Sequence, residues 1–228
     1  MAQPPPDLVK QVRKFIFDTF EATGAAPVIE QIMPRFGLDR AQAFQALMAL
    51  QDAHHIALVK GTQRILMAFP FSSVTTPFRV TAQGRTYYTN CAWDSIAMHV
   101  ALDKEERIDS YCHHCAEKVR IHLREGTVAS SSPEKVVVYL ALPASRWWQD
   151  IIDTCSNNMV FFSSEAHLEE WKEGNGVEGG AALTLGQIIK LSLPLYKTKM
   201  SLDYARPPKE QLQAYFESLG LTGKFWRL

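Results

Sequence analysis

The irregular mixture of short helical and short strand patterns most constrains the fold of this 228-residue chain. Apolar residues at helical spacing predict helices at residues 7–23 and 27–36, and a third that starts from Asp39 as its N-cap. A β pattern over residues 56–69 follows and turns at Lys60-Gly61. Beyond residue 78, helix and strand patterns alternate without an internal repeat. This order favours an α+β fold.

Two prolines suggest where the chain divides. Three helices followed by a hairpin are the outline of a winged helix, so residues 1–70 are expected to form a winged-helix-like three-helix domain. Pro70 and Pro77 bracket small polar residues, which predicts a linker at residues 71–77. Residues 78–200 are then expected to form a mixed α/β domain with small sheets flanked by helices, and residues 201–228 a C-terminal helical extension.

The patterns of the second domain predict its elements individually. A hairpin is expected to turn near Gly84, and a helix follows from Cys91. The remaining predictions are strands at Ile108–Tyr111, Val119–Leu123, "KVVVYLAL" and "MVFF", helices at "SRWWQDIIDTC", Glu165–Glu173, "TLGQIIKLSLPLY" and after Pro207-Pro208, and a glycine-rich loop at "GNGVEGG".

Charge argues against nucleic acid as a partner. Lys and Arg total 24, as do Asp and Glu, so no net field attracts a polyanion or an anionic membrane. The first 70 residues carry seven basic and six acidic side chains. The expected third helix has no Arg or Lys after Arg40 to contact phosphate or guanine. A domain that packs on its neighbour is favoured over one that binds DNA.

Composition also predicts the compartment. The opening "MAQPPPDLVK" lacks a charged region followed by an apolar run, so no signal peptide is expected. No stretch approaches the roughly 20 apolar residues of a membrane span. A cytoplasmic location with reduced thiols is therefore the expectation for the four cysteines.

The stretch "YYTNCAWDSIAMHVAL" sets Cys91 one helical turn before Asp94. With Asn90 as N-cap, Cys91 would be the first helical residue, where free N–H groups favour a thiolate. Burial and a neighbouring thiolate would raise the pKa of Asp94, so it could donate a proton near neutral pH. Simple packing and a helix-dipole role remain the alternative for both residues.

Cys155 makes a metal-binding interpretation stronger. It lies where a predicted helix ends and the buried strand "MVFF" begins. Two thiolates from separate segments, Cys91 and Cys155, could hold one soft metal ion. Cys112 and Cys115 form a single CxxC, which is half of a zinc site, and His122 is a further candidate ligand for it. A structural role without metal is favoured for that pair.

Around these cysteines the sequence resembles the organomercurial (alkylmercury) lyase family. The resemblance begins at "YYTNCAWDSIAMHVAL" and continues through "IDSYCHHCAEKVRIHL" and "VVVYLALPASRWWQDIIDTCSNNMVFFSSEAHLEEW". It covers residues 78–196 well and the N-terminal helices in outline only. Cys112 fits a family cysteine with a structural role, and Cys155 fits the second active-site cysteine.

The resemblance implies a reaction and the residues that carry it. Cys91 and Cys155 would bind the mercury of R–Hg⁺, and Asp94, the third expected metal-binding residue, would deliver a proton to carbon. Trp93, Phe161 and Phe162 could form an apolar wall that keeps the carboxylate neutral and accepts the organic group, with simple core packing as the alternative for each of them. Mercury would be substrate and product, with no resident cofactor, and external thiols would be needed for turnover. A mercuric reductase receiving Hg²⁺ is an implied partner.

Two other functions stay open. A thiolate protein that carries or senses a soft metal would need Cys91 and Cys155 but gains little from Asp94. A paralogue in the same family could use the cysteines on another substrate.

Overall fold

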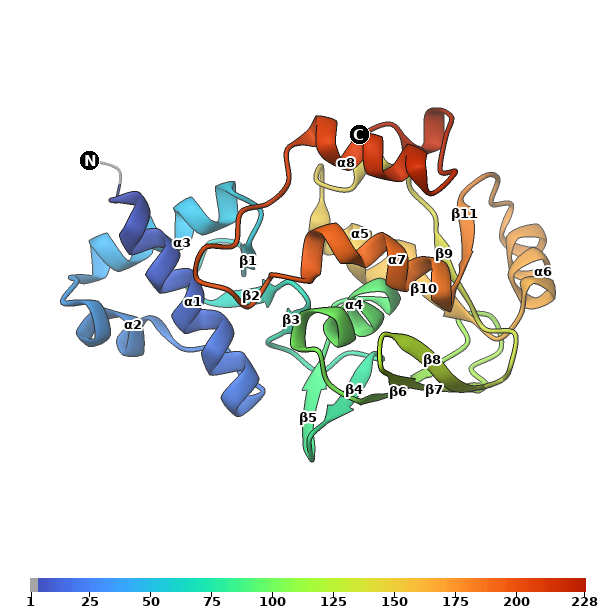
Figure 1. The fold of residues 1–228 in the computed structure, drawn as a ribbon, viewed down its shortest axis with the longest axis horizontal. Helices are drawn as coiled ribbons and strands as arrows, with labels where there is room; N and C mark the ends of the chain where they lie inside the picture. The colour runs from blue at the N-terminus through green and yellow to red at the C-terminus, as the bar shows by residue number, and fades with distance from the viewer. Residues whose placement is uncertain (1–3) are drawn as a thin grey trace.

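The computed structural model describes residues 4–228, which form a helical N-terminal part beside a larger part with two sheets (Figure 1). Residues 1–3 lie outside this range. They belong to the predicted 1–70 domain and to the N-terminal segment in which no signal peptide is expected. The helices are α1 (Pro6–Thr23), α2 (Ile29–Phe36), α3 (Arg40–Asp52), α4 (Ala92–Leu102), α5 (Ile151–Asn158), α6 (Glu165–Asn175), α7 (Leu185–Tyr196) and α8 (Lys209–Ser218), with 3-10 turns at Ala144–Arg146 and Lys224–Trp226. The strands are β1 (Ile56–Leu58), β2 (Ile65–Ala68), β3 (Phe71–Ser72), β4 (Arg79–Ala82), β5 (Arg85–Tyr88), β6 (Glu106–Tyr111), β7 (Lys118–Arg124), β8 (Thr127–Ser132), β9 (Val137–Leu140), β10 (Met159–Phe162) and β11 (Ala181–Thr184).

The three predicted N-terminal helices form close to their expected ends. Gly37 ends α2 with a left-handed φ of 64°. Asp39 caps α3 by accepting a hydrogen bond from the backbone N–H of Gln42 at 2.8 Å. The small antiparallel sheet β1-β2-β3 follows. The predicted linker 71–77 begins with β3, because the ring of Phe71 is buried and stacks on Phe20 at 5.1 Å.

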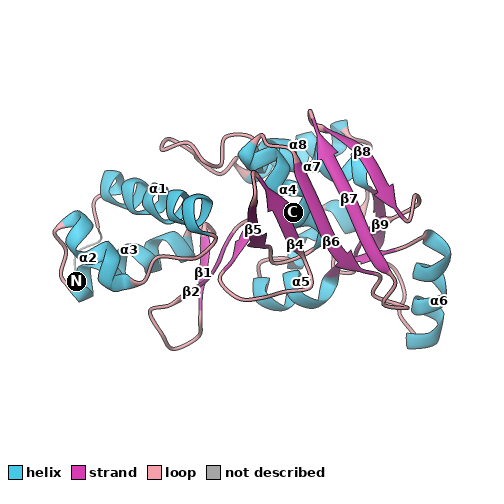
Figure 2. Ribbon diagram, turned by 90° about the horizontal axis from the view of Figure 1, so that it is seen from below, coloured by secondary structure: helices cyan, strands magenta, loops and turns pink. Residues whose placement is uncertain are grey.

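A five-stranded antiparallel sheet, ordered β5-β4-β6-β7-β8, forms one side of the larger part (Figure 2). Two-residue turns set its register, and each turn has positive φ at both positions: Gln83 (49°) with Gly84 (74°), and Glu125 (53°) with Gly126 (72°). Such turns match the twist of paired strands. The first confirms the hairpin predicted near Gly84. The second creates β8, which the sequence analysis did not predict.

Helix α4 lies at the centre of the larger part, and all but one of its residues are buried. It packs against α7, where the indole N–H of Trp93 donates to the hydroxyl of Ser192 at 2.8 Å. A second, three-stranded sheet, β10-β9-β11, lies against the same core. The central helix is therefore fixed on several sides, and so are the side chains at its first turn.

The segment "SRWWQDIIDTC" is not one helix, contrary to the prediction. A 3-10 turn at Ala144–Arg146 is followed by turns, and α5 starts only after Asp150. The Asp150 side chain accepts from the N–H of Asp153 at 3.0 Å and so caps a new helix. Propensity alone does not reveal this break, because the N-cap carboxylate competes with helix continuation.

The C-terminal segment returns to the N-terminal helices. After α7 the chain runs beside α1 before it reaches α8 (Figure 1). The buried guanidinium of Arg13 in α1 donates to the carbonyl of Lys199 at 2.8 Å and to that of Ser201. The first and last parts of the chain thus hold each other in place. Within residues 4–228, none of the helices combines the length and the apolar character that crossing a bilayer requires.

Glu106 is a buried carboxyl group in the sheet, and it generates a prediction about stability. Both carboxyl oxygens lack a hydrogen-bond partner, and burial raises the pKa well above its ordinary value of 4.5. Above pH 4.5 the unfolded chain releases this proton while the folded chain keeps it, so stability falls as pH rises towards the folded pKa. Glu106→Gln should remove this loss, which reaches at most about 1.4 kcal/mol per pH unit.

Urea unfolding of the wild type and of Glu106→Gln between pH 5 and pH 8 measures the effect. The free energy of unfolding of Glu106→Gln should exceed that of the wild type by an amount that increases with pH. The exposed Glu134→Gln is the matched control and should show no such increase. Parallel curves for the wild type and Glu106→Gln would contradict the argument.

Candidate functional site

The first turn of α4 places a thiol and a carboxyl group side by side. Cys91, not Asn90, is the N-cap: its backbone is extended (φ −158°, ψ 177°), and its Sγ accepts from the N–H of Asp94 at 3.3 Å. The prediction of Cys91 as the first helical residue is therefore wrong by one position. Asn90 instead uses its amide to donate to Asp94 Oδ2 at 2.8 Å. The sulfur can cap the helix because it accepts the bond that an Asn oxygen would otherwise take.

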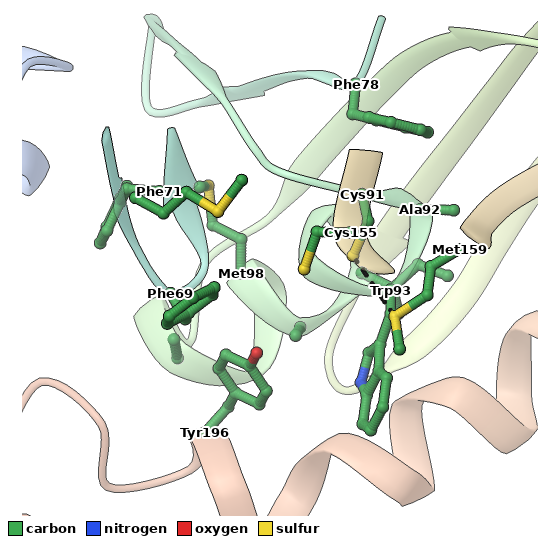
Figure 3. Close-up of a cluster of buried hydrophobic side chains, with 14 of the residues drawn as sticks. Phe69, Phe71, Phe78, Cys91, Ala92, Trp93, Met98, Cys155, Met159 and Tyr196 are labelled. Carbon is green, nitrogen blue, oxygen red and sulfur yellow. Dashed lines mark hydrogen bonds between the residues drawn. The ribbon is translucent and has the colours of Figure 1, made fainter. Parts of the chain in front are cut away.

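Cys155 completes a cluster of three metal-ligating side chains. It comes from α5, and its Sγ, the Sγ of Cys91 and a carboxyl oxygen of Asp94 all lie within 4.8 Å of one another. All three residues are buried. The thioether of Met159 lies 3.9 Å from the Cys91 sulfur, and Figure 3 shows the three sulfur atoms in one region of the core. The structure thus brings together the three side chains predicted from sequence; the roles assigned to them stay predictions.

Two hydrogen bonds fix the carboxyl group of Asp94. The Tyr196 hydroxyl donates to Oδ1 at 2.7 Å, and Asn90 occupies Oδ2. Burial raises the pKa of Asp94 to about 6, although these donors and the nearby positive charge of Lys199 act to lower it. The expected contribution of Cys91 has the opposite sign, because its hydrogen bond with the carboxylate lowers this pKa. Asp94 is therefore mostly ionised at neutral pH, and a small fall in pH is enough to protonate it.

Both thiols of the site hold their protons. Burial, the hydrogen bond with Cys155 and the charge of Asp94 together raise the pKa of Cys91 well above its ordinary value. The same hydrogen bond lowers the pKa of Cys155, but burial and the charge of Asp94 outweigh it, so the pKa of Cys155 is also raised. The predicted thiolate at the helix N-terminus is therefore wrong for the free protein. A metal that binds here must displace thiol protons, and Asp94 is the adjacent acceptor.

A mostly apolar pocket opens onto the cluster. Trp93, Trp148 and Phe69 are among its lining residues. The Trp148 ring stacks on His54 at 4.0 Å and meets the edge of Phe69 at 5.6 Å, so the turn after α3 and the β2–β3 segment contribute to the pocket. Of the three aromatic residues predicted to form a wall, Trp93 lines this pocket, and its role there stays a prediction.

Phe161 and Phe162 do not belong to that wall. Phe161 packs on Phe78 at 6.1 Å, and Phe162 packs on Trp171 at 5.5 Å. Neither phenylalanine lines the pocket. β10 instead presents Met159, at its start, to the cluster.

Three further side chains at this site were not singled out from sequence. Tyr196 ends α7, and Lys199 and Arg206 follow it in the returning segment; all line the pocket. Burial and the charges of Arg206 and Arg13 lower the pKa of Lys199 to about 7. The Arg206 guanidinium lies 4.3 Å from the Trp148 ring centroid. These residues lie more than 100 positions after Asp94, and no local motif marks them.

A second cluster lies at the far end of β10. The Sγ atoms of Cys112 and Cys115 lie 3.9 Å and 3.5 Å from His167 Nδ1. Burial acts to raise the pKa of Cys112, but backbone N–H groups of Ser163, Cys115 and His114 outweigh it and lower the pKa to about 6. The candidate His122 is not part of this cluster, because its Nε2 pairs with Glu105 Oε1 at 2.6 Å.

The sequence is similar to known alkylmercury lyases. The alkylmercury lyase family profile matches residues 71–197. The alkylmercury lyase of Bacillus cereus is 26% identical over 118 residues, which is 52% of either chain. That of Staphylococcus epidermidis is 26% identical over 150 residues, which is 66% of either chain. That of Streptomyces lividans is 25% identical over 182 residues, 80% of either chain. The match spans about half the length of the Bacillus relative.

A solved structure shares the fold. The crystal structure of the mercury-bound form of MerB2 superposes with a TM-score of 0.69 at 22% identity, covering 88% of this chain and 94% of that one. This likeness supports the mixed α+β architecture with small antiparallel sheets. Because the family profile covers more than half of the chain and includes both α4 and α5, the chain belongs to the alkylmercury lyase family.

Proposed function

We propose that this protein is an organomercurial lyase that cleaves the carbon–mercury bond by protonolysis. The observation that carries the proposal is the buried cluster of two thiols and one carboxyl group within 4.8 Å, beside an apolar pocket. Thiols are the ligands that a soft metal prefers, and a carboxyl group among them adds proton transfer, which metal storage does not need.

The first step is exchange of thiol ligands on mercury. R–Hg⁺ arrives bound to an external thiolate, and the sulfurs of Cys91 and Cys155 replace that thiolate. Two thiol protons are released: one goes to the departing thiolate and the other to Asp94. Asp94 is suited to this because it is ionised at neutral pH and its pKa is about 6.

The second step is protonation of carbon. Two sulfur ligands increase electron density on the mercury–carbon bond, and Asp94 returns its proton to the carbon. The hydrocarbon RH leaves, the bonding pair stays with RH, and Hg²⁺ remains on the two thiolates. Tyr196 and Asn90 stabilise the carboxylate that is formed again, since both already donate to its oxygens.

Turnover then requires external thiols. Two of them exchange with Cys91 and Cys155, restore both thiols and carry Hg²⁺ away, so no resident cofactor is needed. A mercuric reductase is the proposed recipient of the ion, and a cytoplasmic location would supply the reduced thiols. The apolar wall at Trp93, Trp148 and Phe69 would hold the organic group.

The N-terminal part is proposed to be a winged-helix-like unit that supports the site and does not bind DNA. It follows the helix, helix, helix and sheet order of such domains. Its His54 and Phe69 line the pocket, and Arg13 holds the backbone of Lys199. Through these contacts the N-terminal unit would help to form the pocket and to position Lys199.

Hydrocarbon release tests the proposal directly. Purified protein with phenylmercury and excess small thiol should release benzene, measured by headspace gas chromatography. Cys91→Ser and Cys155→Ser should each abolish release, because a hydroxyl is a poor ligand for mercury. Cys115→Ser, outside the site, is the matched control and should remain active. Tight mercury binding without benzene from the wild type would favour a metal carrier or a paralogue with another substrate.

The pH dependence of kcat/KM should show the ionisation of Asp94. Activity should fall as pH drops through about 6, because a protonated Asp94 cannot accept the thiol proton. The charge of Lys199 lowers the pKa of Asp94, so Lys199→Met should move this acid limb of the pH profile, where activity falls, to higher pH. The exposed neighbour variant Lys197→Met should leave it in place. An acid limb that does not move in Lys199→Met would contradict this electrostatic link.

A further inference from the structure

The side chains of Cys112, Cys115 and His167 form a second group that could hold a metal ion, and the proposed lyase reaction does not use it. Cys112 and Cys115 lie in the turn between β6 and β7, while His167 lies in the first turn of α6. Their ligand atoms all lie within 4.8 Å of one another. Cys112 is buried, His167 is half-buried and Cys115 is exposed. An ion could therefore enter from the Cys115 side.

We propose that this cluster is a zinc site with three protein ligands. In tetrahedral coordination, with Zn–S about 2.3 Å and Zn–N about 2.0 Å, sulfur and nitrogen lie about 3.5 Å apart. The sulfurs of Cys115 and Cys112 lie 3.5 Å and 3.9 Å from His167 Nδ1. The ligands are thus already at nearly the spacing that the ion requires. Two thiolates with an imidazole suit Zn²⁺ better than a hard, oxygen-seeking cation.

The backbone around the cluster holds its ligands in place without the ion. The Cys112–Glu117 turn is closed by hydrogen bonds from Cys112 N to Glu117 O at 2.8 Å and from Ala116 N to Cys112 O at 3.0 Å. The N–H of His113 donates to the carbonyl of Phe161 at 2.8 Å and fixes this turn on β10. Little ordering is left for metal binding to impose, which favours affinity.

One contact in the free protein competes with the ion. The hydroxyl of Ser163 lies 2.5 Å from His167 Nδ1, so this bond must break when zinc takes the nitrogen. The fourth position is assigned to water, because the exposed side of the cluster faces solvent. His114, whose ring lies 5.6 Å from that of His167, is close by, but its Nε2 pairs with Glu170 at 3.3 Å.

Zinc bound here would join two parts of the fold. It would connect the β6–β7 turn of the five-stranded sheet to the start of α6, directly after β10. β10 begins at Met159, whose sulfur contacts Cys91. The proposed ion therefore fixes the end of β10 opposite the lyase site. Its expected effect is on stability.

Cobalt substitution tests the site without reference to activity. Reduced protein, freed of metal with a chelator, would be titrated with Co²⁺ under anaerobic conditions. The wild type should bind one Co²⁺ at this cluster with the strong visible bands of tetrahedral cobalt and a thiolate-to-cobalt charge-transfer band, and Zn²⁺ should displace it. Excess Zn²⁺ at about 100 times its Kd should raise Tm by roughly 5–10 °C.

Matched variants assign the signal to its ligands. Cys115→Ser and His167→Gln should both lose the tetrahedral spectrum and the Tm increase, with circular dichroism confirming that they fold. Cys155→Ser, in the first cluster, and His122→Gln, outside both clusters, should keep both signals. The proposal is overturned if the wild type shows no tetrahedral cobalt bands, or if either ligand variant retains them. Loss of the bands in Cys155→Ser would also overturn it by assigning the metal to the first cluster.

Discussion

The burial of the Asp94 carboxyl group is the constraint on which the site depends. A carboxylate withdrawn from water is costly unless hydrogen-bond donors surround it. Tyr196 and Asn90 supply two donors, and the charge of Lys199 lies nearby. These groups hold the pKa near 6, which suits the proton transfer that the proposed reaction assigns to this carboxylate. With fewer donors Asp94 would stay protonated, and in open water it would stay ionised.

Distant segments of the chain have to meet to create that environment. Asp94 lies in the first turn of α4, Tyr196 ends α7, and Arg13 of α1 holds the backbone carbonyl of Lys199. Packing of α4 against α7 fixes the donor distance, and the return of the chain to α1 fixes the cation. This explains why the N-terminal helices contribute to a site whose thiols lie in the other part.

Local sequence signals predicted much of the fold because they act within a few residues. Asp39 as a cap and Gly84 as a turn residue were recognisable, and the structure confirms both. β8 was missed although Glu125-Gly126 forms the same type of turn, because "TVASSS" has little apolar alternation. The break before α5 was missed because Asp150 acts as a cap inside an apparently continuous helical pattern.

The site was predictable in its ligands but not in their surroundings. Cys91, Asp94 and Cys155 were identified by residue type and by family resemblance, and the fold brings them together. The thiol pKa was predicted with the wrong sign, because burial outweighs the helix N-terminus, and no local pattern shows how deeply a side chain is buried. Tyr196, Lys199 and His167 were missed for a related reason: each meets its cysteine or carboxyl partner only through tertiary packing.

The central claim is that thiols bind the metal while Asp94 transfers the proton, so the two tasks should separate. A single-turnover reaction of Asp94→Asn with limiting phenylmercury measures both, as mercury retained on the protein and as benzene released. We expect phenylmercury to be retained, with the second thiol proton passing to solvent instead of Asp94, and benzene formation to be slowed by about 10²–10⁴-fold, the usual contribution of a placed acid. Benzene formation at the wild-type rate would contradict the account.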